Sequence, residues 1–240
     1  MDQNEAKRLA ARAAIEELPP SGVAGSGSDG TVRAVTIGLG SGSTAKLFVD
    51  EVGARVRAGA AYCGVPTSKA TRAQAEALGV PLLADEDAWG EIAVTVDGAD
   101  EVDEHLDMIK GGGGALTREK IVNDASRRNV IIVDESKMKK RLGESWAIPV
   151  EVLRFGFGHT KAALAKLGEP RVRERDGATY VTDAGNYIVD LATGPIADAR
   201  ALDLALHAIP GVVETGLFLA RASLVIVAGP SGIRRLTPAK

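Results

Sequence analysis

The chain has 240 residues, of which 45% are hydrophobic and 25% charged, and this composition is typical of a globular protein with one large domain or two small ones. Its formal net charge of −3 argues against a nucleic-acid-binding protein that relies on a basic surface. No apolar run reaches the roughly 18 residues that a transmembrane helix needs. We therefore expect no nucleic-acid partner and no membrane partner.

The N-terminal segment, residues 1–18, is charged throughout and lacks the apolar core of a signal peptide. The single cysteine, Cys63, excludes an internal disulfide bond and is expected to be a buried thiol. These features lead us to expect a cytoplasmic protein. The histidines at 105, 159 and 207 do not have the spacing of metal ligands, so no metal site is expected.

The first elements are a helix, a connector and a strand. Residues 4–18 place charged residues and Ala or Leu at helical spacing, and Pro19-Pro20 ends this predicted helix. Residues 21–30 are rich in Gly and Ser, which predicts a flexible connector. The first strand is predicted over 31–38.

A glycine-rich turn follows this strand. Gly38, Gly40 and Gly42 alternate with other residues, and Ser43 and Thr44 open an amphipathic helix. Backbone N–H groups and the helix dipole favour an anion at such a turn. The turn lacks the third glycine of the dinucleotide fingerprint and the lysine of the Walker motif, so a small phosphate ester fits better than a nucleotide. A helix cap without any ligand is the alternative.

The chain then alternates strands with helices. Strands are predicted over 60–65, 80–85, 92–96 and within 129–137, and a helix capped by Thr67 or Ser68 runs to Leu78. The runs at 92–96 and 129–133 are apolar and β-branched, as in buried parallel strands. The sequence therefore predicts a Rossmann-like, doubly wound α/β sheet that is mostly parallel.

Polar side chains follow two of these strands. Asp97, Asp100 and Glu101 come after the strand at 92–96, and Lys137 comes after the strand that begins at residue 129. In open α/β sheets, ligands bind at the carboxyl ends of the strands. These side chains are therefore candidates for a binding site, although a solvated acidic loop would also explain the acids alone.

A lysine, a glycine run and a glutamate follow closely. Lys110 precedes Gly111–Gly114, whose backbone N–H groups suit an anionic or oxygen-rich ligand. Residues 115–125 are helical in composition and place Glu119 in the first turns of the predicted helix. Glycine runs also occur in plain linkers. The combination of the glycine run with the preceding acids favours a functional site.

The second half of the chain has a different organisation. Residues 148–218 predict the order β-α-β-β-α-β, which is the ferredoxin-like split βαβ unit, and they carry no motif of their own. Residues 223–232 return to the buried-strand pattern and are expected to rejoin the first sheet. We therefore predict a catalytic domain made of 1–147 and 217–240, with a lid or assembly domain over 148–216 inserted into it.

Five motifs carry a resemblance to a known family. GLGSGSTA at 38–45, TVDGADEVD at 95–103, MIKGGGGALTREKIV at 108–122, DESK at 134–137 and VTDAGNYIVD at 181–190 resemble ribose-5-phosphate isomerase type A. The resemblance extends over nearly the whole chain. Ser41 stands where the family usually has Thr, and Gly114 stands where many members have Ala.

The resemblance implies an enzyme that interconverts ribose 5-phosphate and ribulose 5-phosphate through a cis-enediolate without a cofactor or metal. It implies that Glu119 is the base, with its pKa raised by shielding from water, and that Lys110 stabilises the enediolate oxygen. Asp97 and Asp100 would bind hydroxyls and assist ring opening. The implied substrate-binding residues are Ser41, Gly42, Ser43, Thr44, Asp97, Gly98, Ala99, Asp100, Lys110, Gly111, Gly112, Gly113 and Lys137.

The resemblance also implies a homodimer or homotetramer whose only other partner is the sugar phosphate. Two other classes of protein are alternatives. One is a non-catalytic sugar-phosphate sensor, which would need an output domain. The other is an acyl or CoA transferase with a glutamate nucleophile, which would need a pantetheine-length channel.

Overall fold

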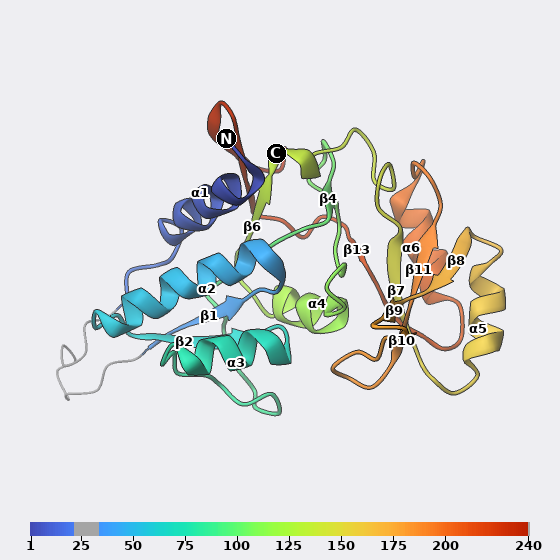
Figure 1. Ribbon diagram of the computed structural model, residues 1–240, viewed down its shortest axis with the longest axis horizontal. Coiled ribbons are helices and arrows are strands. Elements are labelled where there is room, and N and C mark those ends of the chain that lie inside the picture. Colours follow the sequence, from blue (N-terminus) through green and yellow to red (C-terminus); the bar gives the residue numbers. More distant parts are fainter. Residues whose placement is uncertain (22–33, 240) are drawn as a thin grey trace. The chain divides into compact units, whose positions relative to one another are not determined.

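The computed structural model describes residues 1–21 and 34–239, and the chain folds into two compact units (Figure 1). The first unit comprises Met1–Gly98, Ile121–Glu135 and Ala222–Lys240, and the second comprises Ala99–Lys120 and Ser136–Arg221. The predicted inserted segment, 148–216, lies wholly within the second unit, and the division into functional domains stays a prediction. The predicted connector at 22–30 and the start of the predicted strand, 31–33, lie outside the described residues.

The first unit contains a six-stranded sheet in the order β15-β14-β6-β3-β1-β2 (Figure 1). Its strands are β1 (Val35–Leu39), β2 (Tyr62–Pro66), β3 (Val94–Asp97), β6 (Asn129–Asp134), β14 (Leu224–Gly229) and β15 (Gly232–Leu236). All neighbouring pairs are parallel except β14 with β15. The mostly parallel Rossmann-like sheet and the return of the C-terminal strand to it are thereby confirmed.

Helices cover this sheet through small and aromatic side chains. The helices of the unit are α1 (Gln3–Ile15), α2 (Gly42–Arg57) and α3 (Lys69–Ala77), and α4 (Leu116–Asp124) ends in it. Ala10 and Ala14 of α1 and Phe48 and Val52 of α2 belong to one hydrophobic core with the strands β1, β3, β6 and β14. The alanines of α1 let that helix lie close to its neighbours, which explains its alternation of charge with Ala.

One predicted strand and one predicted helix start differ from the structure. Residues 80–85 form only an isolated bridge, Gly64 with Leu82, because Pro81 has no N–H to extend a ladder. Helix α2 begins at Gly42, one residue before Ser43, and Ser41 is its N-cap. The predicted cap of α3 is confirmed for Ser68, whose Oγ accepts from the N–H of Thr71 at 3.0 Å.

The second unit contains a four-stranded antiparallel sheet in the order β12-β7-β11-β8 (Figure 1). Its elements in chain order are β7 (Ile148–Val152), α5 (Phe157–Leu164), β8 (Glu169–Val172), β11 (Tyr187–Ala192), α6 (Ala199–His207) and β12 (Val212–Thr215). Each helix joins two strands that are separated by another strand in the sheet, which is the split βαβ arrangement. The predicted ferredoxin-like order is therefore confirmed.

Short elements complete the second unit. A three-stranded sheet has the order β13-β5-β4, a hairpin joins β9 to β10, and the 3-10 helix η1 opens the return to this unit. Their bounds are β4 (Glu101–Val102), β5 (Met108–Ile109), β9 (Glu174–Arg175), β10 (Ala178–Thr179), β13 (Leu217–Phe218) and η1 (Glu135–Lys137). Buried Ile109 and Leu217 place the small sheet in the same core as β7 and β11.

Candidate active site

The glycine turn of the first unit is built around the buried carboxylate of Asp97. Oδ1 of Asp97 accepts the N–H of Ser41 at 2.9 Å and the N–H of Gly98 at 2.8 Å. Gly40 is required there because a Cβ at that position would lie 2.2 Å from Oδ1 of Asp97. Asp97 is 3% exposed, so the carboxylate fixes the turn from within. The structure thus brings together the predicted residues at 40–42 and 97–98.

Hydroxyl groups from Thr67 and from Thr71 of α3, whose role in this turn the sequence did not indicate, support it. Oγ of Ser41 lies 2.6 Å from Oγ1 of Thr67, which donates to the carbonyl oxygen of Leu39 at 3.1 Å. Thr71 donates to the carbonyl oxygen of Gly40 at 3.0 Å. Ser41 is therefore held by its own side chain as well as by its N–H. Residues 67–71 read as a helix cap in the sequence, so nothing local indicated this second role.

Ser43 and Thr44 lie in the first turn of α2. Ser43 is exposed and Thr44 is half-buried, so both remain accessible in the first unit. The N-terminal N–H groups of a helix favour negatively charged groups. The predicted anion-binding role of 42–44 fits this position.

In the second unit, the glycine loop at 111–114 is packed against Asp100. The N–H of Gly112 donates to Oδ2 of Asp100 at 2.7 Å, and the N–H of Gly114 donates to the carbonyl oxygen of Gly111 at 2.9 Å. A Cβ at Gly112 would lie 2.6 Å from Oδ1 of Asp100 and 2.9 Å from the ring of Trp146. Two amides of the run are therefore engaged inside the unit, while Gly113 is exposed.

Burial makes the charged form of Asp100 unfavourable. Burial raises its pKa above the ordinary value, and the N–H of Gly112 and the charges of Lys110, Lys137 and Arg173 act in the opposite direction. A carboxylate that is costly to keep charged binds a hydrogen-bond donor strongly. Asp100 is thus suited to hold a hydroxyl group.

Lys110 and Glu119 form a buried ion pair. Nζ of Lys110 lies 3.5 Å from Oε2 of Glu119, and the two side chains are only 3% and 5% exposed. Lys110 follows β5, and Glu119 is in the first turns of α4, so the glycine loop connects the two elements. Nζ of Lys110 also lies 5.3 Å from the ring centroid of Phe218. A carboxylate that can take a proton thus lies beside an ammonium that can stabilise negative charge on oxygen.

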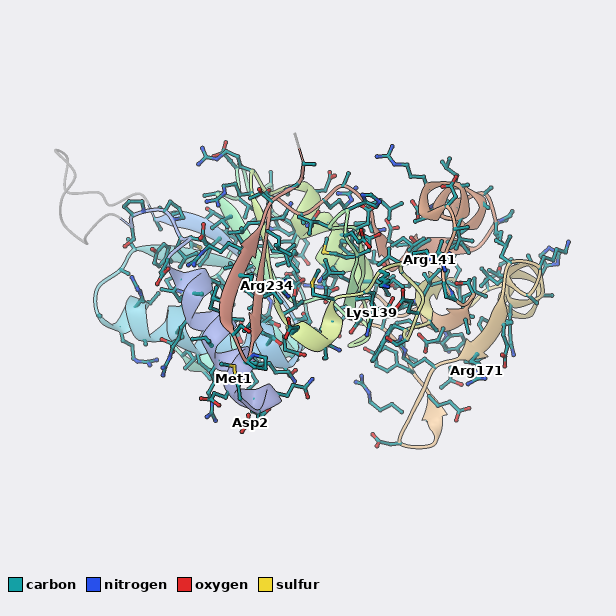
Figure 2. All side chains as sticks on the ribbon, turned by 90° about the horizontal axis from the view of Figure 1, so that it is seen from above. Met1, Asp2, Lys139, Arg141, Arg171 and Arg234 are labelled. Carbon is teal, nitrogen blue, oxygen red and sulfur yellow. The ribbon has the colours of Figure 1, made fainter. Side chains whose placement is uncertain are left out.

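Lys137 is half-buried on η1, and its Nζ lies 5.2 Å from the ring centroid of Trp146. Trp146 also packs against Gly112, so Lys137 belongs to the surroundings of the glycine loop. Figure 2 labels Lys139 and Arg141, which follow it. Arg141 is exposed, in keeping with a solvated basic face.

Two groups that hold the loop and α4 were missed by the sequence analysis. Arg173 donates to the carbonyl oxygens of Gly111 and Gly112 at 2.7 and 3.1 Å. Buried Glu151 on β7 accepts from Oγ1 of Thr117 at 2.6 Å, two residues before Glu119. For Glu151 the available signal was a charged residue within an apolar strand, which needs a polar partner when it is buried. Such a signal does not reveal the partner.

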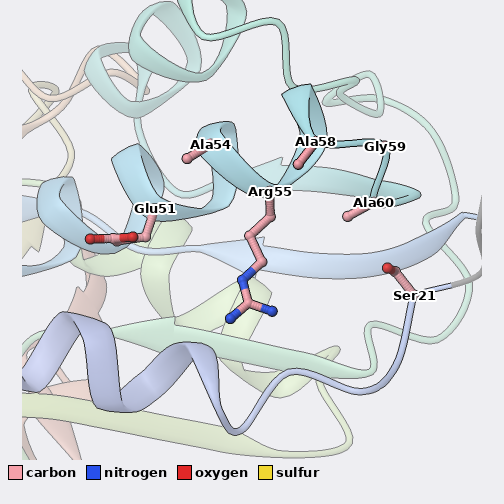
Figure 3. Close-up of a pocket in the computed structure, with 7 residues that line it drawn as sticks. All are labelled: Ser21, Glu51, Ala54, Arg55, Ala58, Gly59 and Ala60. Carbon is pink, nitrogen blue, oxygen red and sulfur yellow. The ribbon is translucent and has the colours of Figure 1, made fainter.

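A hollow of about 550 Å³ lies elsewhere in the first unit (Figure 3). Glu51, Arg55 and Ala58 line it, near the C-terminal end of α2, whereas the glycine turn is at the N-terminal end of that helix. It contains none of the predicted site residues. Within 1–21 and 34–239, no helix is long and apolar enough to cross a membrane, and no three His, Cys, Asp or Glu side chains form a metal-binding group.

Comparisons with known proteins give one consistent result. The model of the family "Ribose 5-phosphate isomerase A (phosphoriboisomerase A)" matches residues 63–232. Ribose-5-phosphate isomerase A of Rhodopseudomonas palustris (strain TIE-1) is 47% identical over 244 residues, which cover 98% of this chain and 99% of that protein.

Solved structures are similar over the same length. Ribose 5-phosphate isomerase from Plasmodium falciparum has a TM-score of 0.89 and 33% identity, covering 99% of this chain and 100% of that one. A D-ribose-5-phosphate isomerase in complex with phospho-erythronic acid has a TM-score of 0.89 and 31% identity, with the same coverage. The sequence motifs, the fold and these relatives agree: the chain belongs to the ribose 5-phosphate isomerase A family.

Proposed function

We propose that this protein interconverts D-ribose 5-phosphate and D-ribulose 5-phosphate as an aldose–ketose isomerase. The observation that carries the proposal is the buried pair of Lys110 and Glu119, 3.5 Å apart beside the glycine loop. Isomerisation moves a proton between C1 and C2 of the sugar and places negative charge on its oxygen. A carboxylate base and an adjacent ammonium supply both requirements.

In this proposal, Glu119 removes the proton from C2 and returns it to C1. Lys110 stabilises the charge that develops on the substrate oxygen, and it does so without water competing because its side chain is 3% exposed. Asp100 accepts a hydrogen bond from a sugar hydroxyl. Half-buried Gly112 holds Asp100 through its N–H at 2.7 Å, and the exposed Gly113 on the same loop contacts a substrate oxygen.

We assign binding roles to the remaining predicted residues. Asp97, Gly98 and Ala99 bind sugar hydroxyls and assist ring opening, Lys137 supplies a positive charge for an anionic group, and the turn at 41–44 offers hydroxyls and helix N–H groups. The solved relative that holds phospho-erythronic acid supports a ligand that combines a phosphate with a hydroxylated carbon chain. The sensor and transferase alternatives have no such support, since this chain matches relatives that are named isomerases, and it matches them over nearly their full length.

Replacement of Glu119 by Gln tests the proposal. The amide keeps the volume of the side chain but cannot accept the proton, so turnover should fall by about 10²–10⁴-fold with KM nearly unchanged. The measurement combines the isomerase assay with exchange of the C2 hydrogen in heavy water. Glu76→Gln, a change of an exposed glutamate, serves as the matched control. Exchange at the wild-type rate in Glu119→Gln would show that another group is the base.

We also propose that the protein is a homodimer or homotetramer that acts in the cytoplasm. Apolar side chains on the surface of the second unit support an assembly: Leu153, Phe155 and Leu204 are 47%, 95% and 73% exposed. Light scattering at micromolar concentration tests the oligomeric state, and a monomer would contradict it.

A further inference from the structure

Arg173 lies just after β8 and connects two parts of the second unit that are far apart in the sequence. Its Nε donates to Oδ2 of Asp190 at 2.9 Å, and a second nitrogen of the guanidinium contacts the other carboxylate oxygen. The third nitrogen donates to the carbonyl oxygens of Gly111 and Gly112 at 2.7 and 3.1 Å. The side chain is 12% exposed, so these contacts form largely away from water. One guanidinium therefore joins the β-sheet to the glycine loop.

This contact determines the direction of two backbone amides. In a planar trans peptide, the C=O and N–H groups point in opposite directions. The carbonyls of Gly111 and Gly112 both point toward Arg173, so the N–H groups of Gly112 and Gly113 point away from it. The N–H of Gly112 accordingly reaches Oδ2 of Asp100 at 2.7 Å. Successive N–H groups on one side of a turn form a concave site for negatively charged oxygen.

The role requires the shape of arginine. A guanidinium has five N–H donors in a fixed plane, enough for a bidentate carboxylate and for two carbonyls on its other edge. Lysine has a single ammonium, which cannot span both partners at once. Arg173 also contributes positive charge near Asp100, which opposes the rise in the pKa of that carboxyl that burial causes. Arg171, two residues earlier, pairs with Glu169 and is 72% exposed.

We propose that Arg173 is a positioning residue for the isomerisation: held by Asp190, it grips the carbonyls of Gly111 and Gly112, and so directs the amide of Gly112 to Asp100 and the amide of Gly113 to a substrate oxygen. This inference rests on the proposed function. It also assigns a role in catalysis to the ferredoxin-like sheet, which carries no motif of its own. Without the guanidinium, the carbonyls of Gly111 and Gly112 lose this contact, while the hydrogen bonds of the loop to Asp100 and within the glycine run remain.

The kinetic test compares Arg173→Ala and Arg173→Lys with Arg171→Ala as the matched control, which removes the exposed guanidinium labelled in Figure 2. A displacement of about 1 Å in a catalytic site costs on the order of 10²-fold in rate. We expect kcat/KM to fall by that order in both Arg173 variants and to stay at the wild-type level in Arg171→Ala. KM should rise, because the amide of Gly113 and the carboxylate of Asp100 also bind the substrate before it reacts. Low concentrations of guanidinium chloride, but not of sodium chloride, should restore part of the activity of Arg173→Ala.

A second readout separates this role from general stabilisation and from the proposed function. Hydrogen exchange of the peptide that covers the glycine loop should be at least several-fold faster in Arg173→Ala than in Arg171→Ala, while the other peptides of β7 and β11 exchange as in the wild type. Wild-type kinetics and wild-type exchange in Arg173→Ala would overturn the inference. An inactive wild-type chain whose loop still loosens in Arg173→Ala would refute the proposed function and support the anchoring of the loop by Arg173.

Discussion

Replacing Glu214 by Gln should destabilise the second unit, because it leaves the buried ammonium of Lys120 without its counter-charge. Nζ of Lys120 donates to Oε1 of Glu214 at 2.7 Å and to the carbonyl oxygens of Thr215 and Leu217 at 2.8 and 2.9 Å. The two side chains are 9% and 22% exposed. Burial lowers the pKa of Lys120, and Glu214 opposes that effect. The carboxylate thus offsets the cost of keeping a charged lysine inside the protein.

The magnitude follows from the burial of the pair. Removing one partner of a buried ion pair costs about 3–5 kcal/mol, and the partial exposure of Glu214 places the expected loss near 3 kcal/mol. The exposed pair of Glu169 with Arg171 provides the control, since its side chains are 66% and 72% exposed. Glu169→Gln should change the free energy of unfolding by less than about 1 kcal/mol.

The effect should depend on pH. Burial alone would raise the pKa of Glu214, but Lys120, the N–H of Thr215 and His207 lower it below its ordinary value. A carboxyl group with a lowered pKa in the folded state contributes stability above its unfolded pKa, and that contribution is lost as the pH falls through the folded pKa. The difference between wild type and Glu214→Gln should therefore be full at neutral pH and shrink in acid, below the ordinary pKa of a glutamate.

Urea unfolding followed by tryptophan fluorescence measures this difference. The chain has two tryptophans, and Trp146 alone belongs to the second unit, so a Trp89→Phe background reports on that unit. A loss of about 3 kcal/mol corresponds to a shift of roughly 1–3 M in the urea midpoint. If Glu214→Gln and Glu169→Gln shift the midpoint equally, the pairing of Lys120 does not stabilise the unit and the reasoning fails.

Two further predictions concern the glycine loop. Asp100→Asn should keep or raise the thermal unfolding temperature, because burial raises the pKa of Asp100 and its charge therefore costs stability at neutral pH. The same change should lower kcat/KM. A calorimetric scan and the isomerase assay measure the two effects, and a lower unfolding temperature would contradict the interpretation. Gly112→Ala should lower kcat/KM by at least tenfold, because its Cβ would lie 2.6 Å from Asp100 and 2.9 Å from Trp146. The control is Gly158→Ala, where no atom lies within 4 Å of the added Cβ. Equal activity of the two variants would refute the packing argument.

Patterns that depend on local sequence predicted the fold well. The apolar, β-branched runs at 129–133 and 92–96 form the buried parallel strands β6 and β3. A strand that is buried on both faces is apolar at nearly every position, so it can be recognised in the sequence. The β-α-β-β-α-β order also followed from local signals. The strand at 80–85 failed because Pro81 breaks the ladder and only one bridge forms.

The parts of the site that depend on distant contacts could not be predicted. Arg173 is 62 residues from Gly111, and it stands in a run, RVRER, where Arg171 and Arg175 look equivalent in the sequence. Only its partner distinguishes it, because Asp190 lies in the apolar strand β11. The support of Ser41 by Thr67 is hidden for the same reason: residues 67–71 serve as a cap for α3 and as hydrogen-bond partners for the preceding turn.

Glu119 and Lys120 of α4 show how the fold sets the chemistry. Glu119 and Lys120 are consecutive and both buried, and each pairs with an opposite charge: Glu119 with Lys110 and Lys120 with Glu214. Successive residues point in directions about 100° apart around a helix, so fixing one side chain fixes the orientation of the other. The three short hydrogen bonds of Lys120 therefore set the rotation of α4, and that rotation brings Glu119 to Lys110.

Phe218 lies next to both ammonium groups, with its ring centroid 5.3 Å from Nζ of Lys110 and 4.8 Å from Nζ of Lys120. Two positive charges near one buried ring would repel each other, but the carboxylates of Glu119 and Glu214 neutralise them separately. Glu214→Gln leaves one ammonium without a counter-charge and so should change turnover as well as stability. The stability of the second unit and the placement of the proposed base thus depend on the same buried charges.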